Sequence, residues 1–139
     1  MRVFLDANVW LSAFTTHGLC ADLVRLLLRL HGDGETVLLL SRQVRHETER
    51  VLQGKFMAGN DDLIPVRTAM GLAERVPDAD WEPPANFPDP DDVGIVAAAL
   101  GAHADLFATG DKALVALGSL DGMQVLTPRQ LYELLLGID

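Results

Sequence analysis

The sequence predicts a single α/β domain over residues 1–139, in three layers, with a mostly parallel sheet of about five strands between two layers of helices. Short apolar segments alternate with helical patterns along the chain, which is the order expected of parallel strands joined by right-handed crossovers. The chain can bury a core, because 49% of its 139 residues are hydrophobic and 22% are charged. Ligands of such sheets gather at the carboxyl ends of the strands, so the residues after each strand are the first candidates for a site.

Four short apolar runs are predicted to be strands. Residues 3–5 and 36–40 are rich in Val and Leu and are followed by Asp6 and Ser41, as expected for strands buried on both faces. Residues 106–109 and 123–126 are followed by Gly-Asp and Thr-Pro, which are turn or capping sequences.

Helices are predicted between the strands from apolar side chains at helical spacing and from capping residues. They cover residues 21–30, residues 41 to about 52, residues 60 or 61 toward 76, residues 89 to about 102, residues 112–117, and a last helix from Thr127-Pro128. Gly32 ends the first helix, and Pro65 disturbs the start of the third. Asp89 caps the fourth with Pro90 at its first position. Residues 77–90 hold five prolines and are predicted to be a loop.

The composition excludes several classes of protein. The single Cys20 excludes an internal disulfide, and the four histidines show no metal-ligand spacing, which argues against structural zinc. No apolar run approaches the ~20 residues needed to cross a bilayer, and no secretory signal is found, so we expect a cytoplasmic protein that does not enter a membrane. The net charge of -9 is unusual for a protein that binds phosphates. Either the partner is not nucleic acid, or the acids are gathered in a site that a metal neutralises.

Two acidic residues follow predicted strands. Asp6 comes directly after the first strand, and Asp111 follows the strand at residues 106–109 by one glycine. Both carboxylates are expected at the same edge of the sheet. Each can equally be the N-cap of the helix that follows it, and a cap alone would explain an aspartate at either position.

Glu47 is predicted to lie on or beside the buried side of its helix. It comes three residues after Val44 and four before Val51, while the exposed side of the helix already carries other charged residues. A carboxylate that points inward needs a partner, and no Lys or Arg near it in sequence provides one. A role in a site is therefore a strong alternative to a solvated surface position.

Asp92 is predicted to point inward from the first turn of its helix. It comes four residues before Val96 and eight before Leu100, and Asp89 lies one turn earlier on the same side. Capping and the favourable placement of negative charge at a helix N-terminus explain both aspartates as well as a functional role does.

A site that gathers these carboxylates requires a cation, because like charges in one crevice repel one another. Ligands that are all oxygen favour hard ions such as Mg2+ or Mn2+ over zinc. Such ions activate water and stabilise charge on a phosphoryl group, and the reaction they indicate is hydrolysis of a phosphodiester.

Four segments of the chain together resemble PIN domains, in the same order. They are Asp6-Ala7-Asn8-Val9, the helix around Glu47, Asp89-Pro90-Asp91-Asp92 with its Ala-rich helix, and residues 104–111, which end in Thr-Gly-Asp. The resemblance implies that Asp6, Glu47, Asp92 and Asp111 bind the metal and carry the catalysis. It adds Asn8 and Thr109 as supporting residues and Asp89 as an additional candidate acid. Gly94 departs from the family pattern and weakens its helix by ~1 kcal/mol relative to Ala.

The resemblance is strongest to small VapC-like toxins that contain Asp-Pro-Asp-Asp. It implies a ribonuclease that uses Mg2+ or Mn2+, acts on RNA, is held inactive by an antitoxin and forms a homodimer. The candidate contacts for RNA phosphates are basic residues near the acids. They are Arg42, Arg45, Arg50, Lys55 and Lys112.

Three other functions are compatible with parts of the sequence. Asp6, Asn8 and the later Gly110-Asp111-Lys112 are also similar to haloacid-dehalogenase-like phosphatases, but Asn8 cannot donate a proton as the second acid does, and Glu47 has no role there. A receiver-type module needs an acceptor aspartate after a middle strand, where this chain has Ser41-Arg42. A PIN fold that serves only as an interaction module remains open.

Overall fold

The computed structural model describes residues 1–137, and within them six strands form one sheet in the order β3-β2-β1-β4-β6-β5. The strands are β1 (Arg2–Leu5), β2 (Val37–Ser41), β3 (Glu74–Val76), β4 (Leu106–Ala108), β5 (Ser119–Leu120) and β6 (Met123–Leu126). Every neighbouring pair is parallel except β5 with β6. The predicted α/β class with a mostly parallel sheet is confirmed, with six strands instead of about five.

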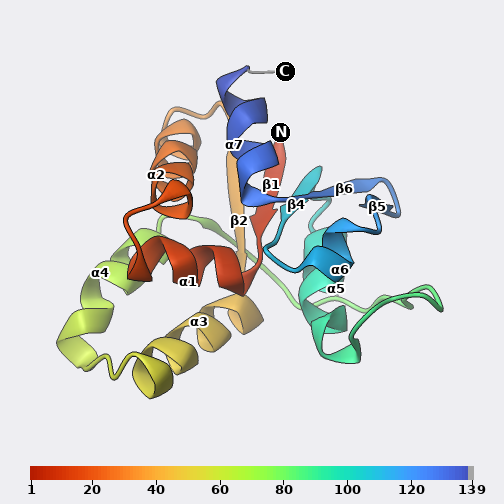
Figure 1. Ribbon diagram of the computed structural model, residues 1–139. Helices are drawn as coiled ribbons and strands as arrows, with labels where there is room; N and C mark the ends of the chain where they lie inside the picture. The colour runs from red at the N-terminus through yellow and green to blue at the C-terminus, as the bar shows by residue number, and fades with distance from the viewer. Residues whose placement is uncertain (138–139) are drawn as a thin grey trace.

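Helices cover both faces of this sheet (Figure 1). Within the described residues they are α1 (Ala7–Thr15), α2 (Leu19–Gly32), α3 (Arg42–Lys55), α4 (Asn60–Met70), α5 (Val93–Gly101), α6 (Lys112–Val115) and α7 (Pro128–Leu136). The helices α2 and α7 pack together on one face, and α5 covers the opposite face. Within residues 1–137 no single helix is long and apolar enough to cross a membrane. By length and composition alone, α1 and α2 pass that test as a pair, bent by 108°.

The core lies where the central strands meet the helices. Phe4 of β1 and Phe107 of β4 are partners in the strand register, and their rings stack with centroids 5.4 Å apart. Trp10 of α1 is fully buried in the same core cluster. Because β1 lies between β2 and β4, the residue that follows β1 is placed at the centre of the carboxyl edge of the sheet.

The largest errors in the predicted helix boundaries concern α4 and α5. The helix expected to run toward residue 76 ends at Met70, and Glu74–Val76 form the edge strand β3. Only Val76 is buried in β3, so this strand shows no apolar run in the sequence. The helix expected from residue 89 begins with a separate 3-10 turn, η1 (Pro90–Asp92), and α5 starts only at Val93.

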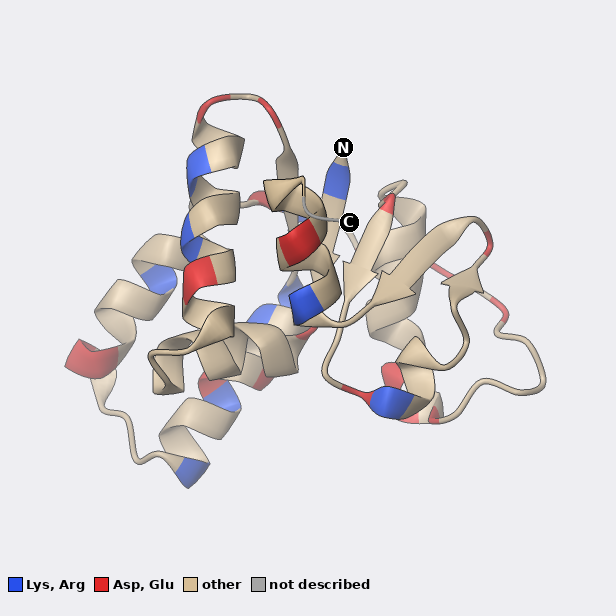
Figure 2. Ribbon diagram, turned by 45° about the horizontal axis from the view of Figure 1, so that its top comes forward, with Lys and Arg blue, Asp and Glu red and all other residues tan. Residues whose placement is uncertain are grey.

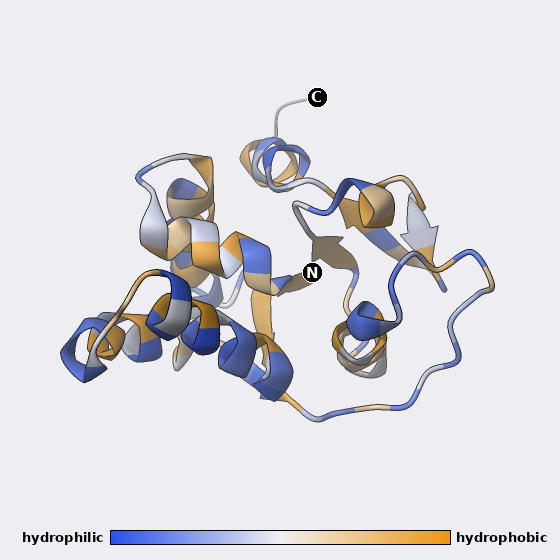
Figure 3. Ribbon diagram, turned by 60° about the horizontal axis from the view of Figure 1, so that its bottom comes forward, coloured by the Kyte–Doolittle hydropathy of each residue, from blue (hydrophilic) through white to orange (hydrophobic). Residues whose placement is uncertain are grey.

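Residues 77–89 form a long extended connection from β3 to η1, as their prolines predicted (Figure 3). Arg42 of α3 pairs with Asp78 at 2.9 Å. The Trp81 indole N–H donates to the Asp121 side chain at 2.9 Å. Asp121 lies in the turn between β5 and β6, at the edge of the sheet opposite β3. The connection is therefore fixed against two separate parts of the fold.

Candidate active site

Asp6 lies at the carboxyl end of β1, where it caps α1. Its side chain is buried, with Oδ1 accepting from the Ala7 backbone N–H at 2.7 Å and Oδ2 accepting from the Thr109 hydroxyl at 2.8 Å. Burial raises the pKa of Asp6, as does the charge of Asp111, while the hydrogen bonds from Thr109 and Ala7 lower it. The capping interpretation is thus correct for Asp6, but it does not explain why a buried carboxylate has a second carboxylate beside it.

Asn8 and Thr109 connect the ends of β1 and β4. The Asn8 Oδ1 atom accepts from the Gly110 backbone N–H at 2.9 Å, and its Nδ2 atom donates to Thr109 Oγ1 at 3.3 Å. Thr109 is fully buried, and its Oγ1 also accepts from the Asp111 backbone N–H at 3.0 Å. These contacts hold the backbone of Asp111 next to Asp6, which is consistent with a supporting role for both residues.

Asp111 repeats the position of Asp6 on the neighbouring strand β4. It caps α6, with Oδ1 accepting from the backbone N–H groups of Ala113 at 2.9 Å and Leu114 at 3.4 Å. Because β1 and β4 are parallel neighbours, both strand-end aspartates face the same crevice.

Asp92 stands between η1 and α5. Its side chain makes no capping hydrogen bond to α5, so the capping interpretation does not hold for Asp92. It does hold for Asp89, which accepts from the Asp91 backbone N–H at 2.9 Å. Burial and, to a lesser extent, the neighbouring negative charges together raise the pKa of Asp92 to about 6. Those charges belong to Asp6, Asp89, Asp111 and Glu47.

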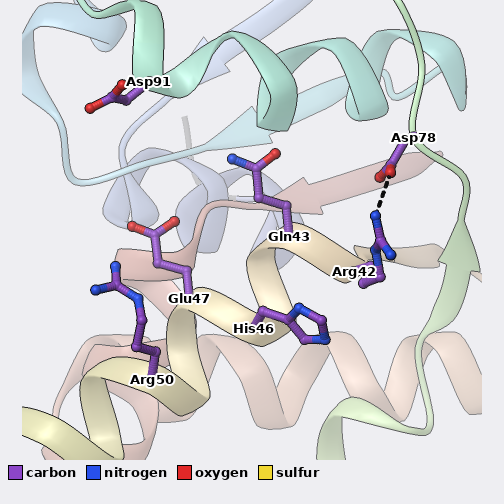
Figure 4. Close-up of a pocket in the computed structure, with 7 residues that line it drawn as sticks. All are labelled: Arg42, Gln43, His46, Glu47, Arg50, Asp78 and Asp91. Carbon is purple, nitrogen blue, oxygen red and sulfur yellow. Dashed lines mark hydrogen bonds and ion pairs between the residues drawn. The ribbon is translucent and has the colours of Figure 1, made fainter.

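Glu47 points from α3 into a cavity of about 710 Å³ (Figure 4). The cavity is lined by Arg42, Gln43, His46, Glu47, Arg50, Asp78 and Asp91. Burial raises the pKa of Glu47, the charge of Asp6 raises it further, and the charge of Arg50 lowers it. The predicted position beside the buried side of the helix is therefore correct. The expectation that no nearby Lys or Arg would act on Glu47 is wrong in part, because Arg50, three residues later, lowers its pKa.

The structure brings Asp6, Glu47 and Asp111, each from a different element, within electrostatic range of Asp92. Within residues 1–137, however, no three acidic, histidine or cysteine side chains already have the spacing of metal ligands. The two observations agree if the carboxylates repel one another and approach only around a cation. Oxygen donors that include one buried and several half-buried carboxylates fit a hard divalent ion.

A comparison with protein families gives a match between the PIN domain and residues 2–113, which include all four acids. The chain belongs to the PIN domain family. PIN domains are generally nucleases, they bind RNA, and they typically use divalent metal ions. This membership favours the nuclease interpretation over the phosphatase alternative. A comparison with curated proteins found no match.

Acidic and basic residues are distributed differently over this PIN domain (Figure 2). Acids gather where η1 meets the start of α6, while basic residues are spread over α2, α3 and α4. Arg50 lines the cavity with Glu47, as does Arg42 at the start of α3. Lys112 begins α6 directly after Asp111.

The remaining predicted phosphate contacts lie elsewhere along α3. Lys55 ends that helix, with its Nζ atom 5.9 Å from the centroid of the Phe56 ring. Arg42 is paired with Asp78, and Arg45 lies 3.8 Å from Glu49. Arg42 nevertheless lines the same cavity as Glu47 and Arg50, whereas Arg45 and Lys55 do not line it.

Sequence reasoning missed four residues of the PIN domain cavity, namely Gln43, His46, Asp78 and Asp91. Gln43 and His46 were hidden because polar residues on a helix look solvated, yet Gln43 lies one turn before Glu47 on the same face. The close approach of α3 and α5 also places the flexible end of the Gln43 side chain against the unexpected Gly94. A Cβ atom at Gly94 would lie 2.5 Å from Gln43 Oε1.

Proposed function

We propose that this PIN domain is an endoribonuclease that depends on Mg2+ or Mn2+, with Asp6, Glu47, Asp92 and Asp111 as its metal-binding and catalytic acids. The observation that carries the proposal is the convergence of four acids from four different elements at the carboxyl edge of the sheet, and the raised pKa of Asp92 supports it. Structural aspartates are seldom held beside several other carboxylates without a cation, because the repulsion lowers stability.

The surroundings of each side chain indicate a different role for it. Asp6 is fixed by its hydrogen bonds to Thr109 and Ala7, so one carboxylate stays oriented before any ligand arrives. Glu47 stands at the cavity, where an RNA strand approaches. A bound divalent ion would supply an activated water and would stabilise charge on the phosphoryl group. Arg50 balances part of the negative charge that RNA meets at the cavity.

The nuclease is tested with purified protein and labelled single-stranded and structured RNA, in Mg2+, in Mn2+ and in EDTA. We expect cleavage only with a divalent ion. Asp6→Asn or Asp92→Asn should lower the rate by at least 10²-fold, on the order of what removing one key electrostatic group costs. The exposed Asp80→Asn in the 77–89 connection is the matched control and should retain the rate. Cleavage in EDTA, or cleavage that survives both substitutions, would sink the proposal.

We also propose that the protein is a VapC-like toxin that forms a homodimer and is held inactive by an antitoxin. Large apolar side chains exposed around α4 support a protein partner on this side. They are Phe56, Met57, Ile64 and Leu72. The test is expression of the chain alone and with the neighbouring open reading frame. We expect growth arrest that Asp6→Asn abolishes and that co-expression relieves, and arrest by Asp6→Asn itself would contradict the toxin role.

A further inference from the structure

Three of the chain's eleven basic residues surround a second, smaller cavity away from the acids. This cavity has a volume of about 120 Å³ and lies between the first turn of α3 and the edge strand β3. It is lined by Leu40, Ser41, Arg42, Arg45, Arg75 and Val76. Its volume is well above the ~10 to 15 Å³ that one water needs, and it is large enough for a phosphate group.

The three arginines are only weakly neutralised by the rest of the protein. Arg42 pairs with Asp78, but both side chains are mostly exposed, and such pairs contribute little. Arg45 lies 3.8 Å from Glu49, whose carboxylate is already held by Arg67 at 2.8 Å. The cluster therefore keeps most of its positive charge.

Two of its donors lack a protein partner. Within residues 1–137, Arg45 Nε is buried and has no hydrogen-bond acceptor. Arg75 likewise has no ion-pair partner within residues 1–137. A buried guanidinium donor without an acceptor is unfavourable, and a bound anion would satisfy it. The N-terminus of the 14-residue helix α3, next to Ser41, adds partial positive charge to the same place.

We propose that Arg42, Arg45 and Arg75 form a phosphate-binding pocket that holds a backbone phosphate of the substrate strand, apart from the bond that is cut. Arg42 lines both this pocket and the larger cavity that holds Glu47, so one strand can pass from the acids over the start of α3 to the arginines. The arginine guanidinium groups would orient the strand by binding its phosphate, and the four acids would carry out the cleavage. This inference rests on the proposed function for the identity of the strand.

The pocket also answers how so acidic a protein holds RNA. A net charge of -9 opposes binding of a polyanion, and the metal site offers positive charge only where the ion sits. A separate arginine pocket supplies an anchor that does not depend on the ion. Arg42 and Arg45 were already predicted phosphate contacts, and Arg75 is new because it lies on a strand that the sequence did not reveal.

The first experiment titrates inorganic phosphate into the metal-free protein and follows the backbone amide NMR shifts. We expect saturable shifts at Ser41, Arg42 and Arg75, and their loss in Arg75→Gln. The matched control is Arg29→Gln, which removes the same charge from an exposed position on α2 and should bind phosphate as the unsubstituted protein does. Identical titrations for Arg75→Gln and Arg29→Gln would overturn the pocket.

The second experiment measures binding of a labelled single-stranded RNA by fluorescence anisotropy in Mg2+ over a range of salt. Arg75→Gln should weaken binding roughly tenfold and reduce the slope of log K against log salt by about 0.7 to 1. Arg75→Lys should recover the slope but only part of the affinity, because lysine lacks the bidentate fork. Phosphate binding without any change in RNA affinity would overturn the assignment to the strand. Neither experiment measures cleavage, so a protein that fails to cut RNA would contradict the proposed function and leave these results interpretable.

Discussion

Thr109 occupies an unusual position for a threonine, fully buried between two aspartates. Its hydroxyl donates to Asp6 at 2.8 Å and accepts from the Asp111 backbone N–H at 3.0 Å, so one oxygen atom links the two acidic residues at the ends of β1 and β4. The sequence Thr-Gly-Asp at this position pointed to a turn or cap. The family resemblance also gave Thr109 as a supporting residue, but its contact with Asp6 across the sheet depends on the pairing of β1 with β4 and is seen only in the structure.

Thr109→Val tests this link, because valine has the same shape and lacks the hydroxyl. We expect the free energy of unfolding to fall by ~1 to 3 kcal/mol, since two buried partners lose their hydrogen bond. The pKa of Asp6 should also rise, because the bond from Thr109 lowers it. Urea unfolding measures the first effect, and the pH dependence of RNA cleavage measures the second. Thr109→Ser keeps the hydroxyl and should stay close to the unsubstituted protein in both, and equal losses in the two variants would contradict this role.

Asp92 makes the stability of the metal-free protein depend on pH. Burial and the surrounding carboxylates raise its pKa from 3.8 to about 6, so the folded state holds more protons than the unfolded chain between these values. The free energy of unfolding should therefore fall as the pH rises through this range. Thermal unfolding in EDTA should give a higher Tm at pH 5 than at pH 7.5. Asp92→Asn should reduce that difference and Asp80→Asn should not, whereas a Tm that rises with pH to the same extent in all three proteins would contradict the argument.

At the scale of elements, helix α5 contains two glycines with different neighbours. A Cβ atom at Gly94 would lie 2.5 Å from Oε1 of Gln43, at the flexible end of that side chain. A Cβ atom at Gly101 would lie 2.7 Å from the Cβ atom of Ala79 in the 77–89 connection. A glutamine side chain can turn away, but the Cβ atom of Ala79 moves only with its backbone.

Alanine at these two positions should therefore have different effects. Gly94→Ala should leave the free energy of unfolding nearly unchanged, because the helix gains up to ~1 kcal/mol and displacement of Gln43 offsets part of it. Gly101→Ala should lower it by ~1 to 3 kcal/mol through overpacking against Ala79. Urea unfolding measures both, and Ala79→Gly should restore most of the loss at Gly101. A loss at Gly101 that Ala79→Gly does not relieve would contradict this account.

Buried strands could be predicted from the sequence, whereas the short strands at the edges of the sheet could not. The strands β1, β2, β4 and β6 are apolar runs because they are buried, and the acids that follow β1 and β4 could be found from that pattern. The edge strand β3 has one buried residue and the strand β5 has two residues, so neither carries a pattern. The arginine pocket was therefore out of reach, since Arg75 lies on β3.

At the scale of the whole molecule, the four acids come from elements that are far apart in the sequence, and their repulsion lowers the stability of the whole domain. The strand β1, the helix α3, the η1–α5 junction and the turn after β4 each bring one carboxylate to the carboxyl edge of the sheet. Their mutual repulsion opposes the fold that unites them, and a cation that binds only the folded protein would remove this opposition.

Divalent ions should consequently stabilise the entire domain. At an Mg2+ or Mn2+ concentration ~100 times the dissociation constant, the gain is about 2.7 kcal/mol, which corresponds to a rise in Tm on the order of 5 to 10 °C for a domain of this size. Calorimetry at pH 7.5 measures it against a sodium salt of equal ionic strength. The rise should shrink in Asp6→Asn and nearly vanish when Asp92→Asn is added, because the double variant has lost two of the four carboxylates that would bind the ion. An equal rise in Tm in the double variant would show that the stabilising ion binds elsewhere on this acidic surface. It would contradict the proposal that the four acids bind the metal.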